Sequence, residues 1–117
     1  MSDHKVTVTF VPPDAATWSF SPRKIPVKNS STITLVAANG SAWKFVRPND
    51  LPSTFTWKLE GNGSKLVITD PNKPPAGEYS FTVTVAATDN KSYTSPLTGV
   101  VLDADVPPVI INDGSSK

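Results

Sequence analysis

The sequence predicts an all-β protein, specifically an antiparallel β-sandwich of about seven to nine strands. Short segments alternate apolar and polar residues with a period of two, as strands with one face in a core require. Turn-forming residues separate these segments at intervals of roughly 8–12 residues, a spacing typical of sandwiches. No segment has a helical apolar period, and 12 prolines disfavour long helices. A closed barrel is the alternative architecture.

The clearest strand pattern covers residues 78–87, which we predict to be a central strand. Its large residues would face the core, and these are Tyr79, Phe81, Val83 and Val85. Its small residues Ser80, Thr82, Thr84 and Ala86 would form the opposite face. That face is nearly uncharged, which makes it a candidate surface for a second subunit.

Similar patterns predict further strands at residues 5–11, 17–20, 25–27, 31–38, 42–46, 55–59, 65–69, 92–95, 99–103 and 109–112. In these strands the residues expected to face the core include Ile33, Leu35, Phe55, Trp57 and Leu59. Asn39-Gly40 predicts a tight hairpin between 31–38 and 42–46, because a primed turn needs positive φ at both central positions. Turn residues also predict hairpins that join 55–59 to 65–69 and 78–87 to 92–95.

Length and composition indicate one soluble domain. The 117 residues would form a single domain over 1–112, followed by a flexible tail over 113–117. No basic stretch followed by an apolar segment lies near Met1, so we expect no signal peptide and a cytoplasmic location. No window of about 20 apolar residues predicts a membrane helix. The net charge of +1 gives no reason to expect nucleic acid as a partner.

The residue inventory argues against catalysis and against a cofactor. There is no cysteine, and His4 is the one histidine, three residues from Met1. A nucleophile with its base, or a thiolate metal site, would therefore lack the necessary residues. We expect neither enzymatic activity nor a cofactor.

Calcium is the metal that the acidic residues could hold. Asp103 and Asp105 are the first candidates, with Asp70, Asp89 or Asp113 possible neighbours. Their spacing is not that of an EF-hand loop, so the alternative, that these residues cap turns or face solvent, is preferred.

Two functional hypotheses follow. The first is a structural or protein-interaction module that can self-associate, because edge strands offer unpaired backbone groups to another chain. We predict edges at residues 25–27 and 109–111, and the candidate interface residues are Ile25, Val27, Thr82, Thr84, Val109 and Ile111. The second is a small carbohydrate- or ligand-binding domain. All three tryptophans alternate with apolar residues on faces assigned to the core, so burial is their preferred interpretation. In the ligand-binding alternative Trp43 would supply an exposed ring, and Asn39, Asp50 and Asp70 would supply polar groups from turns and loops.

Three stretches resemble known families. Residues 18–35 resemble the early strands of cupredoxins, although their type 1 copper site needs two histidines and a cysteine. Residues 75–90, followed by Tyr93, are similar to the late strands of bacterial immunoglobulin-like and cadherin-like modules, which are mostly adhesive or structural. Asp70-Pro71 and residues 106–112 resemble the uncharacterised bacterial DP-EP family, although no Glu-Pro dipeptide occurs here. These resemblances imply an immunoglobulin-like Greek-key sandwich and exclude the copper function.

Overall fold

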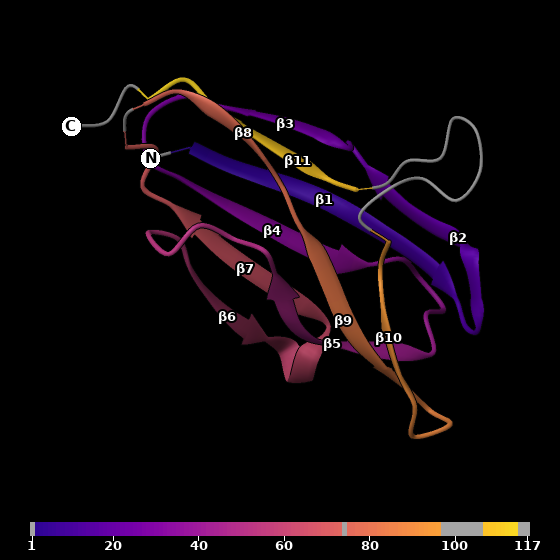
Figure 1. The fold of residues 1–117 in the computed structure, drawn as a ribbon. Coiled ribbons are helices and arrows are strands. Elements are labelled where there is room, and N and C mark those ends of the chain that lie inside the picture. The colour runs from indigo at the N-terminus through magenta and orange to yellow at the C-terminus, as the bar shows by residue number, and fades with distance from the viewer. Residues whose placement is uncertain (1, 74, 97–106, 115–117) are drawn as a thin grey trace.

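The computed structural model describes residues 2–73, 75–96 and 107–114 (Figure 1). These residues form eleven strands and one short 3₁₀ helix. In chain order they are β1 (Ser2–Val11), β2 (Asp14–Ser21), β3 (Lys24–Val27), β4 (Ser31–Ala37), β5 (Trp43–Asn49), β6 (Thr56–Glu60), η1 (Gly61–Gly63), β7 (Lys65–Asp70), β8 (Gly77–Ser80), β9 (Thr82–Ala87), β10 (Ser92–Thr94) and β11 (Val109–Asn112). The predicted strand at 99–103 lies outside the described residues.

The strands pack as two layers. One layer is a five-stranded sheet in the order β2-β1-β4-β7-β6. The other consists of two three-stranded sheets, β10-β9-β5 and β3-β11-β8. Only Phe81 separates β8 from β9, so these two sheets share one long run of chain, which crosses in front of β1, β4 and β7 in Figure 1. The prediction of an all-β sandwich is confirmed.

Two strand pairs are parallel, so the sheets are mixed and not purely antiparallel. β1 pairs with β4 and β11 pairs with β3, both in parallel. Neither pair is consecutive in the chain: between β1 and β4 the chain passes through β2 and then through β3 in the other layer. Parallel strands need such a crossover, whereas a tight hairpin reverses the chain direction.

The core lies between the two layers and is built from the predicted inward faces. Ile33 and Leu35 in β4 are fully buried, as are Val83 and Val85 in β9. Further fully buried residues come from β1, β7, β11 and the β8–β9 junction, and they include Val6, Val8, Leu66, Ile68, Phe81 and Ile110. Such burial contributes roughly 1.5–3 kcal/mol for each large side chain. The core therefore extends along the whole sandwich.

Aromatic side chains fill one end of this core. The rings of Phe10 and Trp18 stack with centroids 4.0 Å apart, and the ring of Trp43 lies 6.2 Å from that of Trp18. Trp43 is buried, and its Nε1 donates a hydrogen bond of 2.8 Å to the carbonyl oxygen of Phe10. Trp18 and Trp43 are therefore core residues, which is the ordinary use of tryptophan in a small domain.

Two predicted hairpins are confirmed and one is wrong. β6 pairs antiparallel with β7, and β9 with β10. Asn39-Gly40, however, does not join a strand pair: β4 pairs with β1 and β7, whereas β5 pairs with β9 in the other layer. Ser41 N–H donates to Ala38 O at 3.1 Å, and φ is positive at Gly40 but not at Asn39. A type I′ turn needs positive φ at both central positions and a type II′ turn needs it at the first, so this turn is neither, and it carries the chain between layers.

The outward face predicted for residues 78–87 is only partly exposed: Ser80 and Ala86 are exposed, whereas its two threonines are buried. Thr82 and Thr84 are only 4% and 3% exposed. The Oγ1 atom of Thr84 lies 2.9 Å from Oγ1 of Thr94 in β10, and it accepts a hydrogen bond of 3.0 Å from Nδ2 of Asn49, the last residue of β5. Because β9 is the central strand of its sheet, side chains from both neighbouring strands cover its outer face.

Candidate functional site

β6 is the strand whose burial departs most from the sequence prediction. Its register pairs Trp57 with Ile68 and Leu59 with Leu66, and both partners are fully buried. Directly paired residues point to the same face of a sheet, so Trp57 and Leu59 lie on the core-facing side. Nevertheless Trp57 is 44% exposed and Leu59 is 40% exposed. The predicted burial of these two side chains is wrong, although Phe55 is buried as predicted.

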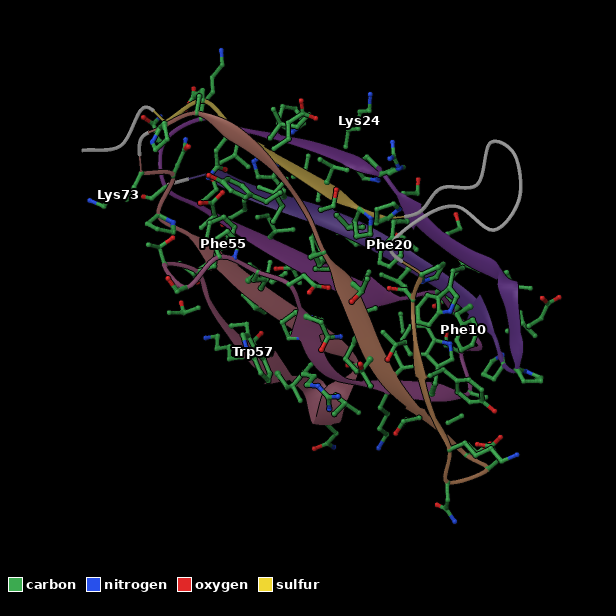
Figure 2. The ribbon with its side chains drawn as sticks, viewed as in Figure 1. Phe10, Phe20, Lys24, Phe55, Trp57 and Lys73 are labelled. Atoms are coloured by element: carbon green, nitrogen blue, oxygen red, sulfur yellow. The ribbon has the colours of Figure 1, made fainter. Side chains whose placement is uncertain are left out.

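The opposing layer explains this exposure, because it ends at β5. β5 is an edge strand of the sheet β10-β9-β5, and it contacts β6, β7 and η1. Gly63 of η1 approaches β5 so closely that a Cβ atom there would lie 3.1 Å from Lys44 Cβ. The core-facing side of β6 extends past this contact into solvent. Figure 2 shows Trp57 beside β6, at the margin of the five-stranded sheet.

The other face of β6 is polar. Thr56, Lys58 and Glu60 alternate with the two apolar residues and are exposed. Lys58 Nζ lies 3.1 Å from Glu60 Oε2, and the two side chains are 68% and 47% exposed. An ion pair this exposed contributes about 0–1 kcal/mol to stability. The charges of Lys58 and Glu60 therefore affect the choice of a binding partner at β6 more than they affect the stability of the fold.

β6 is an edge strand, with β7 as its one neighbour among the described strands. Proteins usually protect such edges with prolines, irregular registers, very short strands or charged side chains, lysine above all. β3 contains Pro26, β5 contains Pro48 and has an irregular register, β2 pairs irregularly with β1, and β8 and β10 have four and three residues. β6 has five residues in a regular register, without proline. Of the edges described, β6 is therefore the one longer than four residues that has neither proline nor an irregular register, and its protection comes from the charges of Lys58 and Glu60.

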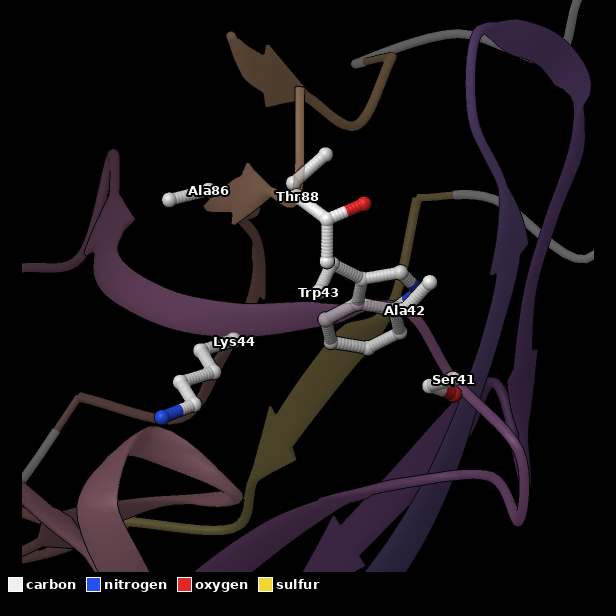
Figure 3. Close-up of a pocket in the computed structure, with 7 residues that line it drawn as sticks. Ser41, Ala42, Trp43, Lys44, Ala86 and Thr88 are labelled. Atoms are coloured by element: carbon white, nitrogen blue, oxygen red, sulfur yellow. The ribbon is translucent and has the colours of Figure 1, made fainter. Parts of the chain in front are cut away.

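A shallow depression of about 390 Å³ lies over the start of β5 and the end of β9 (Figure 3). Its lining comes from Ser41, Ala42, Trp43, Lys44, Ala86, Ala87 and Thr88. Trp43 is the predicted ligand-binding ring, but its side chain is only 5% exposed. The expectation of an exposed Trp43 is therefore wrong, because its ring packs in the aromatic end of the core.

The four predicted ligand residues do not come together. Asp70, at the end of β7, pairs in register with Ser31 at the start of β4, whereas Asn39 follows the end of β4. Trp43 begins β5, and Asp50 follows its last residue. Asp50 is exposed, and its Oδ2 accepts a hydrogen bond of 3.5 Å from Thr82 Oγ1. These positions lie at opposite ends of two strands, so they do not form a single ligand site.

The predicted interface residues are mostly inaccessible. Ile25, Val27 and Val109 are 1%, 2% and 6% exposed, and Ile111 is half-buried. β3 is an edge strand as predicted, but β11 lies in the centre of its sheet, between β3 and β8. The edge predicted at 109–111 is therefore wrong, because β8 occupies its second side. Together with the buried Thr82 and Thr84, these side chains belong to the fold and do not form an exposed face.

Polar side chains form a buried cluster where β7 and β11 end. Asp70 and Asn72 are fully buried, and Asn112 is 4% exposed. Asp70 Oδ1 accepts hydrogen bonds from Asn72 N–H at 2.7 Å and from Asn112 Nδ2 at 3.1 Å. Asn72 Nδ2 donates to Asp113 Oδ1 at 2.7 Å and to the carbonyl of Val27 at 3.3 Å. This cluster ties the β7–β8 connection to the end of β11.

The second oxygen of Asp70 and the side-chain oxygen of Asn112 have no hydrogen-bond partner among the described residues. Burial raises the pKa of Asp70, although the bonds from Asn72 and Asn112 act in the opposite direction. A buried carboxyl group whose charged form is disfavoured tends to hold a proton. A protonated Asp70 would have an O–H donor, whereas the ionised carboxylate has acceptors alone.

Metal binding finds little support in the described part of the chain. No three side chains of the His, Cys, Asp and Glu types gather there in a group that could hold a metal ion. Asp103 and Asp105 lie outside the described residues. Asp89 caps a turn: its Oδ1 accepts from Lys91 N–H and its Oδ2 from Tyr93 Oη, both at 2.9 Å. These bonds lower the pKa of Asp89 and raise that of Tyr93.

His4 is part of β1 and lies in register with Ile33 of β4. Its Nε2 atom is buried and has no hydrogen-bond partner among the residues described. Among the described residues no nucleophile therefore forms a hydrogen bond with this nitrogen.

Comparison of the chain with protein-family models, curated proteins and solved structures finds no significant match. Within the described residues, no helix has the length and apolar character needed to cross a membrane. The exposed edge of β6 is thus the feature that points to a function, and it comes from the geometry alone.

Proposed function

We propose that this protein is a non-catalytic interaction module that binds an extended segment of a protein chain along the edge of β6. One observation carries the proposal: the exposed apolar residues Trp57 and Leu59 lie on a described edge strand that has neither proline nor an irregular register. A strand added at this edge would form a ladder of hydrogen bonds with β6. Its own apolar side chains would cover Trp57 and Leu59.

The gain from covering these side chains is substantial. With 44% of Trp57 and 40% of Leu59 exposed, an added strand removes on the order of 150–200 Å² of mostly apolar surface from water, worth about 4 kcal/mol. Tryptophan is also enriched among the residues that dominate binding energies. Because association has its own entropic cost, we expect a weak and reversible complex.

A carbohydrate ligand is the alternative, since an exposed tryptophan can stack on a sugar ring. The surroundings of Trp57 favour a peptide instead. Its neighbours on the same face, Leu59 and the paired Ile68 and Leu66, are apolar, whereas Lys58 lies on the opposite face. A site for a small polar ligand needs a few convergent hydrogen-bonding groups.

Selection of random displayed peptides against the protein tests the proposal. We expect the selected peptides to be extended, rich in β-branched and aromatic residues, and to shift the backbone amide NMR signals of residues 56–60. Leu59→Ser should weaken their binding at least tenfold. Val11→Ser is the matched control, because Val11 is 60% exposed but belongs to β1, and it should leave binding unchanged.

The proposal is wrong if no peptide is selected above background, or if selected peptides bind the Leu59→Ser variant as well as the unaltered protein. A glycan array supplies the competing result. Glycan binding that is lost in Trp57→Ala but retained in Leu59→Ser would favour the carbohydrate alternative.

A further inference from the structure

We infer that the partner bound at β6 is a second copy of this chain, paired antiparallel with the two-fold axis at Leu59. This inference rests on the proposed function and identifies its partner. It begins from the geometry of an edge-to-edge pair, in which two copies of one strand are related by an axis perpendicular to the sheet.

The alternation of β6 limits the possible registers. Apolar and polar faces stay matched only if the axis passes through a residue, because a shift of one residue would place Trp57 opposite a polar side chain. The axis can therefore lie at Trp57, Lys58 or Leu59 while keeping three or more residue pairs within β6. These three registers differ in how they pair the charges.

The charges favour the axis at Leu59. In that register Lys58 of each copy lies opposite Glu60 of the other, so two opposite-charge pairs form. Each Lys58 would then have two carboxylate neighbours, because it already lies 3.1 Å from its own Glu60. With the axis at Lys58, the two Lys58 side chains would face each other, and like charges directly opposite are destabilising. With the axis at Trp57, Lys58 faces Thr56 and forms no new ion pair.

The apolar face fits the same register. Leu59 meets its own copy at the axis, and Trp57 lies opposite Gly61 at the start of η1. β6 has ended at this glycine, whose φ is +59°, so the strand pairing stops there, and the missing side chain leaves room for the indole ring. The formal net charge of +1 adds little repulsion between the copies.

The size of the contact predicts a weak dimer. A pair of five-residue strands falls below the roughly 1,200 Å² of total buried area found in stable interfaces. Self-association should therefore be measured by sedimentation velocity over protein concentrations up to about 1 mM, where weak complexes become populated. We expect the sedimentation coefficient to rise with concentration, and Trp57→Ser to suppress that rise.

The absence of cysteine from the sequence allows the register to be tested directly. At the two-fold axis a residue lies opposite its own copy, within about 4.5–5.5 Å between Cβ atoms, close to what a disulfide requires. Under mild oxidation we expect Leu59→Cys to form a disulfide-linked dimer at least tenfold faster than Trp57→Cys or Lys58→Cys. Val11→Cys, exposed on β1, measures the rate of random collision.

Charge reversal tests the ion pairs independently. Lys58→Glu and Glu60→Lys should each weaken self-association about tenfold, because each places like charges opposite at two positions. An equimolar mixture of the two variants should restore association, since one copy then carries two acidic and the other two basic side chains. Both substituted side chains are largely exposed, so circular dichroism should show unchanged folding.

The outcomes separate this inference from the proposed function. A wild-type protein that remains monomeric near 1 mM overturns the second copy as partner, yet the peptide selection can still succeed. Faster cross-linking through Lys58→Cys overturns the register at Leu59. Dimers that are unaffected by Trp57→Ser and by charge reversal show that the copies meet elsewhere, which also overturns the inference.

Discussion

Leu59 and Leu66 form a matched pair for testing the exposed edge. They lie directly opposite each other on the same face of neighbouring strands, but Leu66 is 0% exposed and Leu59 is 40% exposed. Leu→Ala removes three carbon atoms, worth about 2.4 kcal/mol when fully buried. For Leu66 a cavity adds to this, which gives about 3–5 kcal/mol. Because Leu59 is about three-fifths buried, Leu59→Ala loses about three-fifths of the 2.4 kcal/mol burial free energy, which is about 1.4 kcal/mol. No cavity adds to this loss, because solvent fills the space.

Urea unfolding followed by tryptophan fluorescence measures both substitutions. The protein should be at about 1 μM, where a weak dimer is dissociated. We expect the midpoint to fall at least twice as far for Leu66→Ala as for Leu59→Ala, with the slope unchanged in both. Equal losses would mean that Leu59 is buried in the monomer, and the exposed edge on which the interaction proposals depend would not exist.

Three further predictions test other parts of the structure. Asp70→Asn should stabilise the protein at neutral pH, because Asp70 has a raised pKa when folded and its charged form is disfavoured. Since the folded state binds the proton more tightly than the unfolded state, the stability of the unaltered protein should rise as pH falls through the raised pKa of Asp70. The unfolding free energies of both proteins, measured between pH 7 and pH 4, should therefore show that the stability advantage of Asp70→Asn shrinks as pH falls. An advantage that grows with acidification would contradict the raised pKa. Trp43→Phe should cost about 1–3 kcal/mol, because the buried carbonyl of Phe10 loses its donor; a loss below about 0.5 kcal/mol in thermal unfolding would show that this bond is unimportant. Gly63→Ala should cost about 1–2 kcal/mol, because φ is +88° and the new Cβ would lie 3.1 Å from Lys44 Cβ; Gly40→Ala is the control for φ alone, since φ is +80° there and no atom lies within 4 Å.

Alternation in the sequence identifies which side chains share a face, but not whether that face is covered. Val83 and Trp57 belong to equally regular alternating patterns, yet Val83 is fully buried and Trp57 is 44% exposed. The difference comes from the opposing layer: the five-stranded sheet covers the inner face of β9, whereas the layer that contains β9 ends at β5 before it covers β6. Thr84 shows the converse case, since its polar face is buried by Asn49 and Thr94. The width of a layer depends on all its strands together and leaves no local signal.

Turn residues likewise indicate where the chain turns, but not between which strands. Asn62-Gly63 lies in a connection that joins two paired strands, whereas Asn39-Gly40 carries the chain from one layer to the other. The sequence predicts that Asp70 is a loop residue, but in the structure it is buried and accepts a hydrogen bond from Asn112, 42 positions away in the sequence. Contacts over such separations depend on the order of strands in the sheets. The fold class and the core were therefore predictable, and the exposed edge was not.

The uneven protection of the sheet edges also determines how many partner strands one molecule can bind. A protein with two unprotected edge strands can bind a further copy at each edge and grow into a fibre of unlimited length. Here Trp57 and Leu59 are confined to β6, while the other described edges carry prolines, irregular registers or very short strands. Once β6 is occupied by another strand, that contact is saturated and growth along the sheet stops. One exposed strand therefore permits stoichiometric recognition without inviting aggregation.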